Sequence, residues 1–203
     1  MKSLSEIETT SKRASKAAGF SWGVSEEVGK SIRLLELFGF PGIKNLSLYY
    51  ERRIIENFQN LTLINKNNES NKLSLCPIAL GISFLDQIKS LENLDKFTFK
   101  NVAFPILFLP FLSRGSEIIG KRILFKFDNN QFLLNLNVNI SSNFFEEKPF
   151  YVAKNIEVNF LENKNSFTEN DWKNLYTLSE DTFVEESESL KRGSAGAGLT
   201  DND

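Results

Sequence analysis

Residues 132–140 read Phe-Leu-Leu-Asn-Leu-Asn-Val-Asn-Ile, with an apolar side chain at every second position from Phe132 to Ile140 and asparagines between the later ones. A period of two places these apolar side chains on one face of an extended strand. The stretch therefore predicts a half-buried β-strand. It lies within residues 97–160, where short aromatic and aliphatic runs alternate with polar residues, and we expect this segment to form the sheet.

Other strands are predicted by similar patterns. Asp128-Asn129-Asn130 has the residue types of a hairpin turn before the central stretch. Pro105 and Pro110 confine a buried-strand candidate between them, because proline cannot donate to a sheet ladder. The additional strands that we expect cover residues 61–64, 73–75, 97–99, 106–109, 123–127 and 156–160.

Residues 1–58 show helical spacing of their apolar residues. Ser3 and Glu6 fit a capping box that begins a first helix, and Gly19 is placed to end it. A second helix is expected to begin at Ser25 and to stop before Gly39. We expect further helices over residues 43–57, over 77–94 with Pro77 in its first turn, and over 168–179.

The expected fold class is α+β. An N-terminal helical subdomain would pack on a mostly antiparallel sheet, followed by a C-terminal helix and an extended, glycine-rich acidic tail. The expected domain is residues 1–183, with residues 1–58 as its helical part and 59–183 as its sheet-containing part. Residues 184–203 form the tail.

Charge and composition exclude several classes of function. The 203 residues hold 24 Lys plus Arg against 26 Asp plus Glu, a net charge of -2. Nucleic-acid binding normally requires a basic patch or stripe, so we expect no nucleic-acid partner.

The N-terminus lacks the apolar core of a signal peptide, and residues 102–112 are too short to span a bilayer. We therefore expect a cytoplasmic protein with no membrane contact.

The chain contains no histidine and a single cysteine, Cys76. These counts exclude a disulfide framework, a CxxC pair and the usual Ser-His-acid or Cys-His catalytic arrangements. An enzyme with this composition would have to use carboxylates, Lys, Arg, Tyr, Ser or Thr. No motif for a cofactor and no cluster of metal ligands stands out, so the sequence predicts no metal site and leaves the cofactor unknown.

The C-terminal tail is a candidate contact element. Gly196 and Gly198 would let the backbone approach another surface closely, and Asp201 and Asp203 would bring negative charge to that place. Such a tail could dock in a partner's cationic pocket or close over a site on its own domain. The competing interpretation is a disordered terminus, because Gly, Ser and Ala bury little apolar surface.

Two further candidate sites lie inside the domain. Trp22 would form an apolar wall while Glu26 or Glu27 acts as acid, base or oxygen ligand. The competing interpretation is structural: Trp22 staples the two helices together. Arg114 lies in a predicted loop, where it could hold a carboxylate or phosphate; the alternative is a solvated turn residue.

Both ends of the chain resemble a bacterial family of small proteins, a domain of unknown function of about this length. The resemblance rests on residues 3–8 (SLSEIE), 17–23 (AAGFSWG), Glu26-Glu27 and the final residues 196–203 (GAGLTDND). It implies that the tail is a feature of the family. It brings no reaction, cofactor or catalytic residue.

Three functions follow as hypotheses. The first is a binding or accessory protein that acts through its tail, as a homo-oligomer or with a metabolic enzyme as its protein partner. The alternative is a histidine-free enzyme acting on a small polar or anionic metabolite, in which Arg114 anchors the substrate while Glu26, Glu27 or Asp201 handles protons or a divalent ion. A purely structural role is the third.

Overall fold

The computed structural model describes residues 2–70, 72–144 and 149–183. By its contacts the chain divides into two compact units, residues 1–163 and residues 164–203. The first unit combines helices with a six-stranded sheet, and the second contains one described helix, α6 (Glu169–Glu180). The predicted α+β class is confirmed.

The sheet of the first unit is mostly antiparallel, as predicted. Its strands are β1 (Asn67–Asn68), β2 (Lys96–Ala103), β3 (Arg122–Phe127), β4 (Asn130–Asn135), β5 (Asn139–Ser142) and β6 (Val152–Leu161), in the order β1-β2-β6-β3-β4-β5. Only the short β1 runs parallel to its neighbour, β2. The turn expected at Asp128 joins β3 to β4, with Phe127 paired to Asn130.

The prediction of one strand over residues 132–140 is wrong. The chain turns back at Leu136 and Asn137, whose φ angles are 52° and 58°, and Asn135 pairs with Asn139 across the resulting hairpin. Asparagine tolerates this left-handed conformation better than most residues. Alternation of polar and apolar residues continues through the turn, so the period of two conceals it.

The helices of the first unit are α1 (Leu4–Ala17), α2 (Trp22–Leu37), α3 (Gly42–Ile55), α4 (Pro77–Leu91) and α5 (Leu109–Ile119), with a 3-10 turn at Pro105–Leu107. The capping box of Ser3 and Glu6 is present. The second helix begins at Trp22 rather than at the predicted Ser25, because Ser21 is its N-cap and Ser25 instead donates to the carbonyl of Ser21.

Residues 106–109 are not the expected buried strand. They belong to the 3-10 turn and the start of α5, so Arg114 lies in a helix and not in a loop. A short, wholly apolar run does not distinguish a strand from a buried helix. Residues 61–64 and 73–75 are not strands either; only isolated bridges join Leu75 to Gln59 and to Val102.

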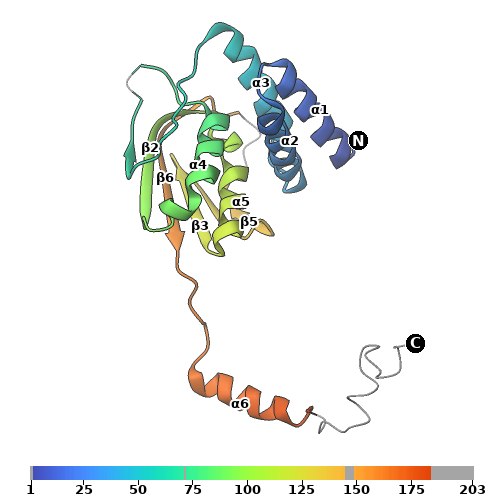
Figure 1. Ribbon diagram of the computed structural model, residues 1–203, viewed down its shortest axis with the longest axis vertical. Coiled ribbons are helices and arrows are strands. Elements are labelled where there is room, and N and C mark those ends of the chain that lie inside the picture. Colours follow the sequence, from blue (N-terminus) through green and yellow to red (C-terminus); the bar gives the residue numbers. More distant parts are fainter. Residues whose placement is uncertain (1, 71, 145–148, 184–203) are drawn as a thin grey trace, which may run out of the picture. The chain divides into compact units, whose positions relative to one another are not determined.

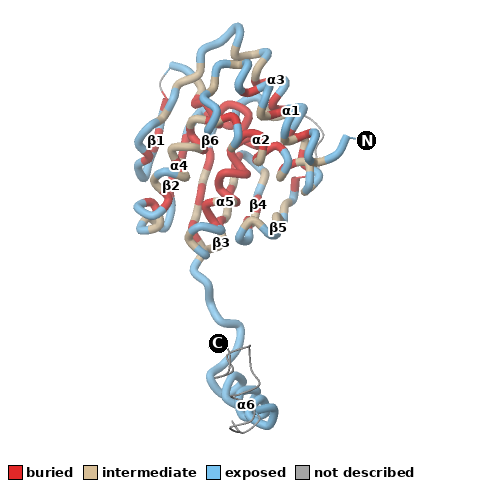
Figure 2. Tube along the Cα trace, turned by 45° about the vertical axis from the view of Figure 1, so that its right-hand side comes forward, coloured by how far each residue is buried: buried red, intermediate tan, exposed pale blue. Residues whose placement is uncertain are grey.

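Helices α4 and α5 cover one face of the sheet, and α1 to α3 lie at one side of it (Figure 1). Buried residues concentrate where α4 and α5 meet the strands (Figure 2). The N-terminal helices pack on the sheet through Phe40, whose ring centroid lies 5.7 Å from that of Phe132. Tyr49 of α3 contacts Phe104 in the same way, at 5.9 Å.

Candidate functional site

A cavity of about 930 Å³ lies where four helices of the first unit begin or end. We call it the interhelical pocket. Its walls come from residues 17–21 and Val24, at the junction of α1 and α2, from parts of residues 49–62, at the end of α3 and in the following loop, and from parts of residues 76–83, at the start of α4. Ligand pockets for small molecules typically measure 300–1,000 Å³. The interhelical pocket therefore has the size of a small-molecule site.

Arg53 supplies the positive charge of this pocket. One guanidinium nitrogen donates to the carbonyl oxygen of Ala18 at 2.8 Å, and the guanidinium carbon lies 4.2 Å from the centre of the Phe20 ring. Arg33, Arg52 and Arg114 each form an ion pair with a carboxylate. Arg53 forms no ion pair with any described carboxylate. A guanidinium has five N–H donors, so Arg53 keeps donors for an anion.

Tyr49 and Cys76 form a buried polar pair in the pocket wall. The phenol oxygen lies 3.0 Å from the sulfur, and both residues are almost fully buried. Burial raises the pKa of Tyr49, and the neighbouring Cys76 adds to the rise. Cys76 is also the N-cap of α4, because its sulfur accepts the backbone N–H of Ala79 at 3.4 Å. The pair fixes α3 against α4.

Tyr50 lies beside this pair and donates to the hydroxyl of Ser15 at 2.5 Å. Burial raises the pKa of Tyr50 to about 12. Both phenols therefore stay protonated near neutral pH, and neither serves there as a general base. They are hydrogen-bonding groups, which favours binding over proton transfer in this pocket.

The helix ends give the pocket a mixed electrostatic character. The first turns of α2 and α4 contribute Ser21 and Cys76, and the N-terminus of a helix favours negative charge. The last turns of α1 and α3 also reach the pocket, and carbonyl ends have the opposite effect. Arg53 satisfies the carbonyl of Ala18 at the end of α1, so the preference for an anion rests on Arg53.

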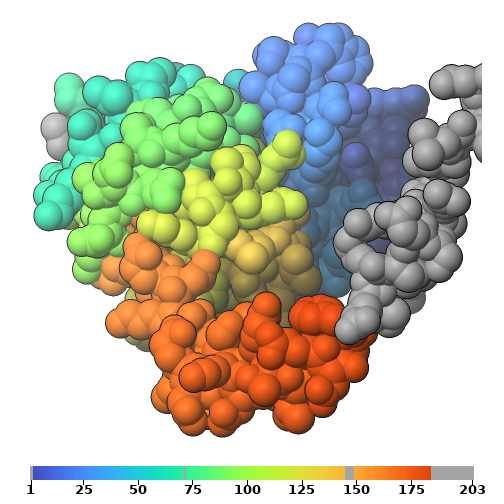
Figure 3. Space-filling model, turned by 60° about the horizontal axis from the view of Figure 1, so that its bottom comes forward, coloured from blue at the N-terminus to red at the C-terminus, as the bar shows by residue number. Residues whose placement is uncertain are grey.

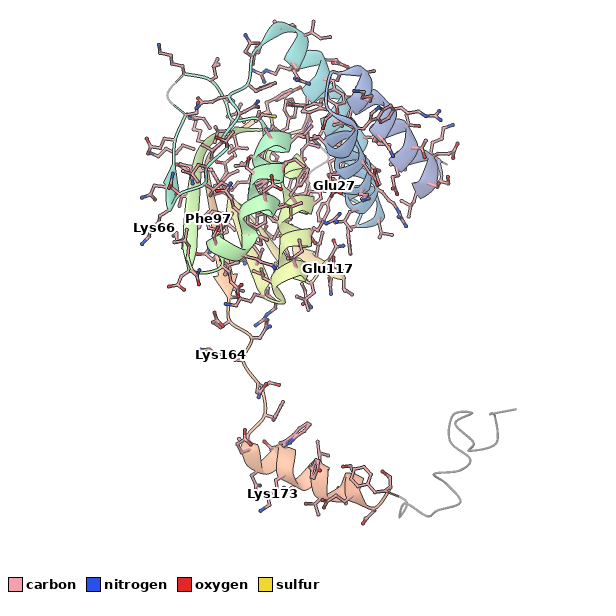
Figure 4. All side chains as sticks on the ribbon, in the orientation of Figure 1. Glu27, Lys66, Phe97, Glu117, Lys164 and Lys173 are labelled. Carbon is pink, nitrogen blue, oxygen red and sulfur yellow. The ribbon has the colours of Figure 1, made fainter. Side chains whose placement is uncertain are left out.

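Glu27 and Arg114, two of the residues singled out in the sequence, meet at a second place. The carboxylate of Glu27 on α2 accepts from Arg114 on α5 at 2.7 Å. They line a smaller groove of about 340 Å³ together with Lys30, Arg33 and Asn137. Figure 4 labels Glu27 on α2. On the face of the first unit that Figure 3 shows, α2 lies beside α5. The cations of this groove have ion-pair partners: Lys30 and Arg114 pair with Glu27, and Arg33 pairs with Glu8 outside the groove.

Glu26 and Trp22 belong to neither cavity. Glu26 pairs with Lys12 and Lys30 on the outer side of α2, and the hydrogen bond from Lys30 is the main cause of its lowered pKa. The ring of Trp22 is 59% exposed, with the ammonium of Lys16 at 5.5 Å from its centre. Gly196, Gly198, Asp201 and Asp203 lie outside the described residues.

Arg53, Tyr49 and Tyr50 were missed by sequence reasoning, which treated residues 43–57 only as a helix. The sequence holds one usable signal, the pair Arg52-Arg53 after Tyr49-Tyr50. Phe20 and Ser21, which lie between the ends predicted for the first two helices, form part of the pocket wall.

The described residues contain neither a cluster of metal ligands nor a membrane-spanning helix. No group of three or more His, Cys, Asp or Glu side chains in residues 2–70, 72–144 and 149–183 could hold a metal ion. No helix in the same ranges is both long and apolar enough to cross a bilayer.

The described residues form an α+β protein whose sheet is covered on one face by α4 and α5, with a small-molecule-sized cavity among its N-terminal helices. Residues 2–94 match the model of a family described as "Protein of unknown function (DUF3726)". Among curated proteins and solved structures, none matches the chain. The matched range contains every wall residue of the interhelical pocket, as well as residues 3–8 and 17–23, whereas the tail lies beyond it.

Proposed function

We propose that the protein binds a small organic anion in the interhelical pocket and acts as a cytoplasmic binding or accessory protein. The observation that carries this proposal is Arg53, a half-buried guanidinium with no carboxylate partner among the described residues, in a cavity of about 930 Å³. A partly buried cation loses part of its hydration, and a bound carboxylate would offset that loss.

The rest of the pocket wall limits the ligand class. Apolar surface comes from Phe20, Phe58 and Leu61, and hydrogen-bonding groups come from Asn60 and Thr62. A ligand with a carboxylate at Arg53 and a flat or branched apolar body beside Phe20 would use both kinds of surface. Aromatic or branched aliphatic carboxylates have this chemistry.

A thermal-shift measurement with two isosteric probes tests the proposal. Benzoate and benzamide share shape and ring but differ in charge. We expect benzoate to raise the melting temperature in a concentration-dependent way and benzamide to raise it far less, because only benzoate satisfies Arg53. Equal shifts with both probes would show that charge plays no part. No shift from benzoate or from a panel of branched aliphatic carboxylates would contradict the proposal.

The tail remains part of this proposal as the contact element for a partner or a second copy. Its support is the sequence alone, through the glycines and the acidic residues Asp201 and Asp203. Deleting residues 193–203 should leave ligand binding and the fold intact and abolish the interaction. An undiminished interaction after this deletion would contradict a role for the tail.

A second candidate function is an enzyme that uses the groove of Glu27 and Arg114. The contact of 2.7 Å between these two residues supports it, because it brings an acid and an anion-binding cation together. The same contact also argues against the enzyme hypothesis, since a substrate anion would have to displace Glu27 from Arg114. Arg114→Ala should then remove a metabolite-dependent thermal shift that Arg53→Gln leaves unchanged.

A further inference from the structure

Two residues of α3 that line the interhelical pocket, Tyr50 and Arg53, contact the end of α1 side by side. The phenol of Tyr50 bonds to the hydroxyl of Ser15. The guanidinium of Arg53 bonds to the carbonyl oxygen of Ala18. These contacts lie three residues apart on each helix, from 50 to 53 and from 15 to 18, which is about 4.5 Å along a helix axis. A ligand bound at Arg53 therefore lies next to Tyr50.

The charge of Arg53 acts on the neighbouring phenol. Burial raises the pKa of Tyr50, and the positive charge of Arg53 opposes this rise. Such an effect requires the two groups to be close, since a charge interaction weakens with distance. The phenol of Tyr50 is thus available to a second group of any ligand that Arg53 holds.

The hydrogen bonds behind Tyr50 fix the direction in which its phenol donates. The hydroxyl of Ser15 lies 2.7 Å from the carbonyl oxygen of Ser11, which can only accept, so Ser15 gives its single proton to Ser11. Tyr50 must then be the donor in its 2.5 Å contact with Ser15. Ser11 and Ser15 are both buried, so little water competes for these groups.

The phenol oxygen of Tyr50 consequently offers a ligand only its lone pairs. Its proton is held by Ser15, and no donor among the described residues bonds to the oxygen itself. Hydrogen bonds in a chain polarise one another, which makes the oxygen at the donating end a better acceptor. The group beside Arg53 therefore suits a ligand that carries a hydrogen-bond donor.

We propose that the ligand of the interhelical pocket is a hydroxylated carboxylate, whose carboxylate binds Arg53 and whose hydroxyl donates to the phenol oxygen of Tyr50. The hydroxyl contact rests on the anion site of the proposed function, because it concerns a second group of the same ligand. An ammonium group would also donate, but it would lie close to the guanidinium, and two like charges at this separation repel each other. The neutral hydroxyl is therefore the favoured donor.

The isomers of hydroxybenzoate are matched probes for this contact. The 3- and 4-isomers hold the hydroxyl away from the carboxylate, whereas the hydroxyl of 2-hydroxybenzoate donates to its own carboxylate and is not free. In calorimetric titrations we expect 3- or 4-hydroxybenzoate to bind about 3- to 10-fold more tightly than benzoate, the value of one neutral hydrogen bond. The 2-isomer should show no such gain.

Variants identify the phenol as the source of the gain, with each protein's affinity for benzoate as its own reference. In Tyr50→Phe the gain should disappear, whereas Tyr151→Phe, at a residue outside the pocket wall, should retain it. Ser15→Ala frees the proton of Tyr50. A 3- or 4-methoxybenzoate, which can only accept, should therefore gain affinity relative to benzoate in Ser15→Ala but not in the wild type. Circular dichroism and unfolding curves show whether each variant folds.

The possible results separate the hydroxyl contact from the anion site. If benzoate fails to bind the wild type, the anion site is wrong and the hydroxyl contact with it. If benzoate binds through Arg53 but neither the 3- nor the 4-hydroxyl adds affinity, only the hydroxylated ligand is overturned. A gain that survives Tyr50→Phe, or one that 2-hydroxybenzoate shares, would overturn it as well.

Discussion

The phenol oxygen of Tyr49 lies 3.0 Å from the sulfur of Cys76, and this contact joins α3 to the first turn of α4 beside the interhelical pocket. The two residues are 27 positions apart in the chain, and both are almost fully buried. Tyr49 also packs against Phe58 and Phe104, so the phenol holds one wall of the pocket in place.

Tyr49→Phe should lower the free energy of unfolding by about 1 kcal/mol, because it removes a buried hydrogen bond while keeping the ring. Urea unfolding monitored by fluorescence measures the change. In a Tyr49→Phe background, Cys76→Ala should cost less than it does in the wild type, since the partner has already been lost. Strictly additive costs would show that the two side chains do not interact.

The buried phenols predict how stability depends on alkaline pH. A tyrosine in an unfolded chain ionises near pH 10, whereas burial raises the pKa of Tyr50 to about 12. Between about pH 10 and pH 12 the unfolded chain has released a proton that the folded chain still binds, so the free energy of unfolding falls as pH rises. Below about pH 10 this contribution is constant.

Urea unfolding at several pH values between about 9 and 11.5 checks this dependence. Tyr50→Phe should reduce the slope above pH 10. Equal slopes for wild type and Tyr50→Phe would contradict the assignment.

Local signals in the sequence predicted much of the fold. Ser3 with Glu6 and Pro77 at a helix start were sufficient because capping and proline geometry act within a few residues. The predictions of a strand over residues 106–109 and of one strand over residues 132–140 were wrong for opposite reasons. The first is apolar on all sides and has no period, whereas the second keeps its period through a turn at Asn137.

The candidate site was much less predictable than the fold. Glu27 and Arg114 were singled out separately, and nothing in the sequence indicated that residues 87 positions apart would form one ion pair. Arg53 was missed because an arginine on an amphipathic helix is usually solvated. Only the tertiary arrangement distinguishes Arg53 from its neighbour Arg52: the ring of Phe20 lies by the Arg53 guanidinium, and Glu56 of the pocket wall pairs with Arg52, whereas no ion pair with a described carboxylate engages Arg53.

Close packing of α4 on α5 predicts the effect of a single methyl group. A Cβ added to Gly81 would lie 2.3 Å from the ring of Phe111, well inside van der Waals contact. Gly81→Ala should therefore lower the free energy of unfolding by about 1–3 kcal/mol, as overpacked cores do. Gly23→Ala is the matched control, since a Cβ there meets nothing within 4 Å and alanine favours the helix. Thermal unfolding of the two variants should move in opposite directions.

The ion pair of Glu27 and Arg114 should contribute little to stability. Their side chains are 24% and 42% exposed, so water and salt screen the attraction. A double-mutant cycle with Glu27→Gln and Arg114→Met should give a coupling free energy below about 1 kcal/mol that shrinks further at high salt. A coupling well above that value would mean that the groove is far less hydrated than its exposure indicates.

The central claim, an anion held by Arg53, is tested most directly by calorimetric titration of benzoate into three proteins: the wild type, Arg53→Gln and Arg52→Gln. Arg52 is the adjacent residue, of the same type, but its guanidinium pairs with Glu56 at 2.9 Å. We predict that Arg53→Gln weakens benzoate binding by about 10- to 100-fold, the value of a charge-assisted hydrogen bond. Arg52→Gln should weaken it far less, because it removes no contact to the anion and only leaves Glu56 of the pocket wall unpaired. Equal affinity of benzoate for all three proteins would contradict the claim.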